Sequence, residues 1–84
     1  MQVDYKKEVK VPNGRIDILT DEYIIEAKYK TTRSSLFSAI GQLNYYKTFF
    51  PDRKLKIISG EVVFQQMINV IAEMEIEHEI IKGF

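Results

Sequence analysis

Residues 9–30 decide the fold, and they read VKVPNGRIDILTDEYIIEAKYK. Apolar and polar residues alternate on both sides of Asn13-Gly14, a pair that accepts the positive φ angles of a tight hairpin turn. A further run rich in β-branched and aromatic residues begins after only Asp21-Glu22. We therefore predict three consecutive antiparallel strands, over residues 3–11, 15–20 and 23–30.

Two amphipathic patterns and two short apolar runs follow these strands. Leu36, Ile40 and Leu43 keep helical spacing as far as Pro51, which cannot continue a helix. The predicted elements are a helix over about 34–50, a strand at 55–58, a helix over about 62–74 and an edge strand at 76–80. The order βββαβαβ predicts an α/β fold of the α+β kind with a mixed sheet, because strand-helix-strand steps make right-handed crossovers between parallel strands.

Composition limits the chain to one small domain, residues 1–84. The absence of cysteine excludes disulfides and thiolate metal sites. We expect an intracellular, cytoplasmic protein without membrane contact, because the chain lacks both a signal-peptide pattern and a run of roughly 18 apolar residues. The formal net charge is zero, yet residues 1–60 hold 11 Lys/Arg against 7 Asp/Glu, and residues 61–84 hold 1 against 5. The excess of positive charge in residues 1–60 permits phosphate binding but does not prove it.

The second hairpin brings two acidic side chains together. A two-residue loop at Asp21-Glu22 places Asp17 directly opposite Glu26, with Cβ atoms about 4.5–5.5 Å apart, where like charges are destabilising. Lys10 and Lys28 could neutralise them as a surface charge ladder. Alternatively a divalent cation binds there, because Mg²⁺ takes one or two carboxylates together with a carbonyl and waters.

The same register sorts the side chains of the three strands into two faces. One face is almost wholly apolar, and we expect a helix to pack on it; it holds Val9, Val11, Ile16, Ile18, Tyr23, Ile25, Ala27 and Tyr29. The other face is charged in its middle and holds Glu8, Lys10, Arg15, Asp17, Leu19, Ile24, Glu26 and Lys28.

Two motifs point to a known family. Asp17, followed by a hairpin and then Glu26-Ala27-Lys28, resembles the D…ExK signature of the PD-(D/E)xK, or restriction-endonuclease-like, nuclease superfamily. Gln42 and Tyr46 lie one turn apart on the first predicted helix and resemble the Q-x-x-x-Y element of its RecB-like branch. The resemblance covers about residues 8–59 and implies a minimal restriction-endonuclease-like core.

The resemblance implies a metal-dependent nuclease that hydrolyses DNA with a metal-activated water. The cofactor would be Mg²⁺ or Mn²⁺, and no small-molecule cofactor is expected. Asp17, Glu26 and the Ala27 carbonyl would hold the metal, and Lys28 would assist the water. Gln42 and Tyr46 either position the site and the DNA backbone or are ordinary helix surface.

Several further residues are candidates for supporting roles. The family usually has a full N-terminal helix with another acidic residue; Glu8 is the nearest substitute, and it is either a third metal ligand or a solvated strand residue. His78 is expected to be a packed or hydrogen-bonded residue outside the site. Phosphate contacts are expected from Lys10, Arg15, Lys30 and Arg33.

The small size of the chain and the missing helix predict a homodimer, formed through Tyr45, Phe49, Phe50 and the second helix. An endonuclease with structure-selective or non-sequence-specific cutting is expected, because no module that could read a groove is present. DNA against RNA, and endo- against exonucleolytic cutting, stay open. So do two rival functions, a catalytically silent DNA-binding module and a small interaction protein.

Overall fold

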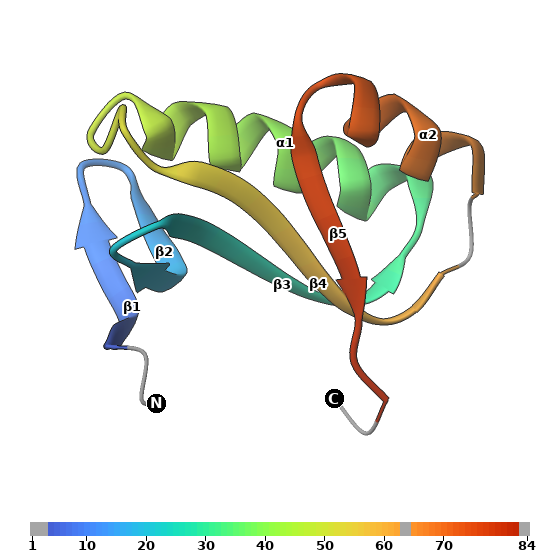
Figure 1. Ribbon diagram of the computed structural model, residues 1–84, viewed down its shortest axis with the longest axis horizontal. Helices are drawn as coiled ribbons and strands as arrows, with labels where there is room; N and C mark the ends of the chain where they lie inside the picture. Colours follow the sequence, from blue (N-terminus) through green and yellow to red (C-terminus); the bar gives the residue numbers. More distant parts are fainter. Residues whose placement is uncertain (1–3, 63–64, 83–84) are drawn as a thin grey trace.

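The computed structural model describes residues 4–62 and 65–82, which form a five-stranded mixed sheet and two helices (Figure 1). The strands lie in the order β1-β2-β3-β4-β5, with antiparallel pairing from β1 to β3 and parallel pairing from β3 to β5. The elements are β1 (Tyr5–Val11), β2 (Gly14–Thr20), β3 (Tyr23–Thr31), α1 (Arg33–Lys47), β4 (Lys54–Val62), α2 (Gln65–Glu73) and β5 (Ile76–Ile80). The predicted order βββαβαβ and the α+β class are confirmed.

Local chemistry sets the bounds of α1. The side chain of Thr32 caps its first turn by accepting a hydrogen bond from the Ser35 N–H at 3.1 Å. The helix ends at Lys47, before the predicted residue 50, because the N–H groups of residues 48–50 bond to carbonyls three residues back. This tightened turn satisfies the last carbonyls of the helix ahead of Pro51.

The second half of the chain differs from prediction at its junctions. Strand β4 is longer than the predicted 55–58 and continues to Val62. The predicted second helix therefore begins too early, and the described part of α2 starts at Gln65. Val63 and Phe64, which the prediction placed in this helix, lie outside the described residues.

The first hairpin turns at Pro12-Asn13 rather than at Asn13-Gly14, since Val11 pairs with Gly14. Asn13 has a φ of 59°. Proline holds φ near about −65°, so this pair fits a type II turn and excludes the expected type I′ turn. The second hairpin has the predicted register, with Ile18 opposite Ile25.

The helices cover the face of β3 opposite to the one predicted. Ile24 is fully buried and Glu26 is 3% exposed, whereas Tyr29 on the predicted core face is 62% exposed. Leu55 and Ile76 lie in register with Ile24, so the two parallel strands enlarge the apolar area on that face. Right-handed crossovers through α1 and α2 then place both helices over it.

Strand β2 contributes to the core from both of its faces. Ile16 and Leu19 are both buried in one cluster although they are three residues apart, so the strand rotates between them. Glu8, at the same level on β1, has a φ of 54°. The twisted hairpin approaches α1, and Val9 packs against the core as predicted.

The core lies between the two helices and this covered face of the sheet. Its buried members are Ile16, Leu19, Ile24, Leu36, Ala39, Leu43, Tyr46, Leu55, Ile57, Met67, Ile71 and Ile76. Across residues 4–62 and 65–82, neither helix has the length and apolar character needed to cross a membrane.

Candidate active site

A groove of about 820 Å³ opens between the β1–β2 hairpin, β3 and the middle of α1. It brings together every predicted site residue except Glu8, Lys30 and Arg33. Its lining consists of Lys10, Val11, Asn13, Gly14, Arg15, Asp17, Glu26, Ala27, Lys28, Gly41, Gln42, Tyr45 and Tyr46. The D…ExK pattern and the Gln/Tyr helix, which lie apart in the sequence, therefore face one another across one hollow.

Asp17 lies where the pairing between β2 and β3 ends. The ladder includes Ile18 opposite Ile25 and does not continue to Asp17 and Glu26. Instead, the Asp17 carboxylate accepts a hydrogen bond from the Ala27 N–H at 3.0 Å. The side chain thus replaces a backbone partner, which holds its carboxylate beside Glu26 while the two strands separate.

Glu26 is a buried carboxylate with incomplete pairing. Its Oε2 lies 3.6 Å from the Lys28 Nζ. Its Oε1 has no hydrogen-bond partner among the described residues. Burial, and secondly the charge of Asp17, raise the pKa of Glu26 to about 7, against a smaller lowering effect of Lys28. A cation at this position would offset both unfavourable terms.

Lys28 follows Glu26 by two residues on β3 and so shares its face of the sheet. Its side chain is 25% exposed, which leaves the ammonium group reachable from the groove. Three donor hydrogens on a positive group suit contact with a water or with a phosphate oxygen.

The residues of α1 have two different functions in the groove. Gln42 carries a buried Oε1 that has no partner in residues 4–62 and 65–82. Tyr46 is almost completely buried, and its hydroxyl accepts a hydrogen bond from the Arg15 N–H at 3.3 Å. Tyr46 therefore holds the hairpin against the helix, and its predicted role in positioning the DNA backbone stays a prediction.

Glycine at position 14 permits this approach. A methyl group there would lie 2.8 Å from Cε1 of Tyr46. The prediction missed a second link, in which the Tyr45 hydroxyl donates to the Pro12 carbonyl at 2.5 Å. The adjacent pair Tyr45-Tyr46 was the sequence signal for this link. Consecutive residues of a helix point in different directions, so the two tyrosines contact different neighbours.

The residues outside the groove are engaged elsewhere. Glu8 is exposed, and its carboxylate lies 3.5 Å from the Arg15 guanidinium. Lys30 lies 3.9 Å from Glu61, and the Arg33 guanidinium lies 5.6 Å from the ring centre of Phe37. The described residues contain no group of three or more His, Cys, Asp or Glu side chains that could hold a metal ion. A ligand role for Glu8 is therefore not supported by its position.

The donor set nevertheless fits a hard divalent cation. Two buried oxygens without a partner in the described part of the chain, Glu26 Oε1 and Gln42 Oε1, belong to residues that line the same groove as Asp17 and Ala27. Mg²⁺ commonly uses only one or two carboxylates and completes its shell with waters and substrate phosphates. Zinc fits poorly, because neither cysteine nor histidine is present in the groove.

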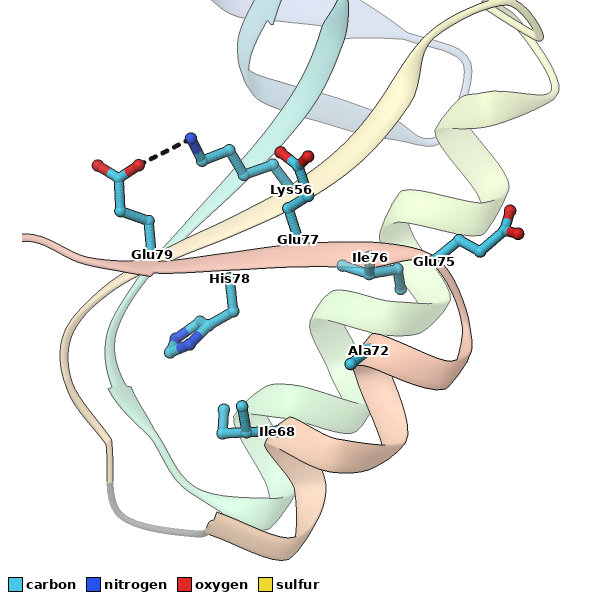
Figure 2. Close-up of a pocket in the computed structure, with 8 residues that line it drawn as sticks. All are labelled: Lys56, Ile68, Ala72, Glu75, Ile76, Glu77, His78 and Glu79. Atoms are coloured by element: carbon cyan, nitrogen blue, oxygen red, sulfur yellow. Dashed lines mark hydrogen bonds and ion pairs between the residues drawn. The ribbon is translucent and has the colours of Figure 1, made fainter.

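A second hollow of about 650 Å³ lies between α2 and β5 (Figure 2). There His78 Nε2 lies 2.8 Å from the hydroxyl of the buried Ser59, and burial lowers the pKa of His78. The hydrogen bond predicted for His78 is confirmed, and His78 does not line the groove of the candidate active site. This hollow contains none of the predicted site residues.

Comparison with known proteins found one informative similarity. The chain is 36% identical over 75 residues to a KilA-N domain-containing protein of Acanthamoeba polyphaga mimivirus. The match covers 88% of this chain and 20% of the viral protein, so the chain spans about a fifth of that relative's length. No protein-family model and no solved structure matches the chain.

Proposed function

We propose that this chain is a metal-dependent nuclease core of the PD-(D/E)xK superfamily, RecB-like branch. The observation that carries the proposal is the pair of carboxylates of Asp17 and Glu26, which share one groove with Lys28 and Gln42. Placing the half-buried Asp17 beside the buried Glu26 raises the free energy of the folded chain, because like charges repel and a buried charge loses its hydration. The arrangement is understandable if a cation and a phosphate complete it.

Each residue then has a definite task. Asp17, Glu26 and the Ala27 carbonyl would hold Mg²⁺ or Mn²⁺, which when bound supplies Lewis acidity and an acidified water. The Lys28 ammonium orients that water or stabilises charge that develops on the phosphate. The bond from the Ala27 N–H to Asp17 keeps the carboxylate in place during this chemistry.

The substrate is proposed to be DNA. Lys10 and Arg15 line the groove and supply positive charge for the phosphate backbone. The viral relative is named for a KilA-N domain, and the match covers 20% of that protein, so the choice of DNA rests on the resemblance to PD-(D/E)xK nucleases. The described elements all belong to the sheet and its two helices, with no separate recognition module among them, so structure-selective or non-sequence-specific endonucleolytic cutting is proposed.

The test is cleavage of supercoiled plasmid, single-stranded and branched DNA in Mg²⁺ or Mn²⁺. Asp17→Asn should abolish cutting while keeping an oxygen for the Ala27 N–H, and Lys28→Ala should lower the rate by about 10²–10³-fold. Asp21→Asn and Lys54→Ala are the matched controls and should cut normally. Tight DNA binding without cutting in either metal would instead indicate a silent binding module.

A further inference from the structure

The two edges of the sheet differ in how well they are protected. At the β1 edge, Lys6, Lys7 and Lys10 supply charge, and Glu8 interrupts the strand with its positive φ. Lysines and local distortions of this kind prevent an edge from pairing with another strand. Strand β5 has no lysine and no positive φ, and its charges are the glutamates Glu77 and Glu79; no described segment pairs with its outer edge.

Free backbone groups follow from the pairing of β5 with β4. The Ile81 N–H donates to the Ser59 carbonyl at 2.8 Å, so backbone groups of the odd-numbered residues face β4. Successive residues of a strand alternate in direction. The N–H and C=O groups of His78 and Ile80 therefore point to the outer edge, where a further strand could bond to them.

The hollow beside this edge has an apolar wall on the helix side. Figure 2 shows Ile68 and Ala72 of α2 and His78 of β5 on this side of the strand. The bond between Ser59 and His78 Nε2 fixes the imidazole ring. Side chains at alternate positions of an added strand would enter this hollow of about 650 Å³.

The opposite side of the same edge is acidic. Glu77 and Glu79, which also line this hollow, lie on the side of β5 opposite His78, and among the described residues Glu79 has a lysine partner, Lys56 at 2.9 Å. Pairing of β5 with β5 of a second copy would bring these glutamates together, which is unfavourable. Basic side chains on an incoming strand would instead find complementary charge.

We propose that the β5 edge binds an extended segment of a partner protein in which apolar residues alternate with lysine or arginine. The apolar residues occupy the groove beside Ile68 and Ala72, and the basic residues meet Glu77 and Glu79. Backbone bonds to the free edge supply affinity, and the alternating pattern supplies specificity. This surface is separate from the candidate active site and does not depend on its activity.

The probe is a fluorescent peptide of alternating lysine and valine, long enough to span β5, with binding to the whole chain followed by anisotropy. Methylating the peptide nitrogens on its bonding edge should weaken binding about tenfold or more, because several backbone hydrogen bonds are lost. A peptide with glutamate in place of lysine should not bind. Equal binding of the methylated peptide would overturn the proposal, because it would show simple charge attraction.

Variants of the chain locate the site. Ala72→Gln fills the groove without changing charge, and the double variant Glu77→Gln/Glu79→Gln removes the acidic side; each should weaken binding at least about tenfold. Asn69→Gln and Glu73→Gln, both exposed on α2 outside the groove, are matched controls. Failure of the wild type to bind the peptide, or self-association of the chain that Ala72→Gln abolishes, would overturn the proposal.

Discussion

Glu26 is the residue whose ionisation is most changed by its surroundings. Its pKa rises from 4.5 to about 7, chiefly through burial. Between these two values the folded chain binds more protons than the unfolded chain. The stabilising contribution of this group is therefore complete below pH 4.5 and is lost as the pH rises to about 7.

The substitution Glu26→Gln is expected to remove this loss of stability with rising pH, since the amide has the same shape and no charge. At about pH 8 the variant should be more stable than the wild type by on the order of 3 kcal/mol, and the difference should shrink toward about pH 4.5. Urea unfolding across this range, with a chelator present, measures it. The lowered pKa of His78 has the opposite pH dependence, but both chains retain it and it cancels. Parallel pH curves would contradict the prediction.

Metal binding should act on the same carboxylate. Mg²⁺ favours the charged form of Glu26, so the stability gained from the metal should be larger at about pH 8 than at about pH 5. At a hundred times the dissociation constant, the gain would be about 2.7 kcal/mol. Thermal unfolding with and without Mg²⁺ measures the gain, and Asp17→Asn should reduce it. An equal gain in that variant would place the metal elsewhere.

At the scale of elements, the hairpin and α1 meet through a contact that needs a glycine. Gly14→Ala should destabilise the fold by about 1–3 kcal/mol, because the added methyl group meets the Tyr46 ring. In a Tyr46→Leu background the alanine should cost less. Urea unfolding of the four chains in this double-mutant cycle measures the coupling. If the two changes in the free energy of unfolding were additive, residue 14 and Tyr46 would not be in unfavourable contact.

Helix α1 also contains a glycine that packing does not require. A methyl group at Gly41 would have no atom within 4 Å, and glycine in a helix costs about 0.5–1 kcal/mol relative to alanine. Gly41→Ala should therefore raise the melting temperature by about 2–8 °C. If Gly41→Ala is more stable yet cuts DNA more slowly, the absence of a side chain at this position is needed for the function of the groove. An unchanged or lower melting temperature would contradict this account of α1.

At the scale of the whole molecule, one face of the described sheet has no helix over it. The predicted dimer surface is partly used within the chain, because Tyr45 and Phe49 stack edge to face at 5.4 Å and Phe50 packs on the core. The homodimer stays a prediction, and we now expect its interface on the open face of the sheet, around Tyr29. A domain of this size buries only about 60% of its unfolded surface, so association would add stability.

Light scattering at micromolar concentration should give a dimer mass for the wild type and a monomer mass for Tyr29→Lys. Phe37 is another exposed aromatic residue, on α1, and Phe37→Lys is the matched control that should remain dimeric. A monomer mass for the wild type would contradict the homodimer.

Local sequence patterns are enough to derive the order of the elements and the central pairing of the candidate site. The two-residue turn at Asp21-Glu22 places Asp17 at the level of Glu26, and the alternation of a strand puts Lys28 on the same face. These relations span only a few residues. Backbone geometry and short turns decide them, so they can be derived without knowing the rest of the fold.

The face that the helices cover and the surroundings of the site cannot be derived in this way and depend on how the whole chain packs. That choice depends on the total apolar area of five strands, including Leu55 and Ile76, whose register no local pattern specifies. Burial of Tyr46 and the unpartnered oxygen of Gln42 follow from how α1 lies over the hairpin. Such properties arise from contacts between distant segments, and the free energies of those contacts are compared only when the whole chain packs.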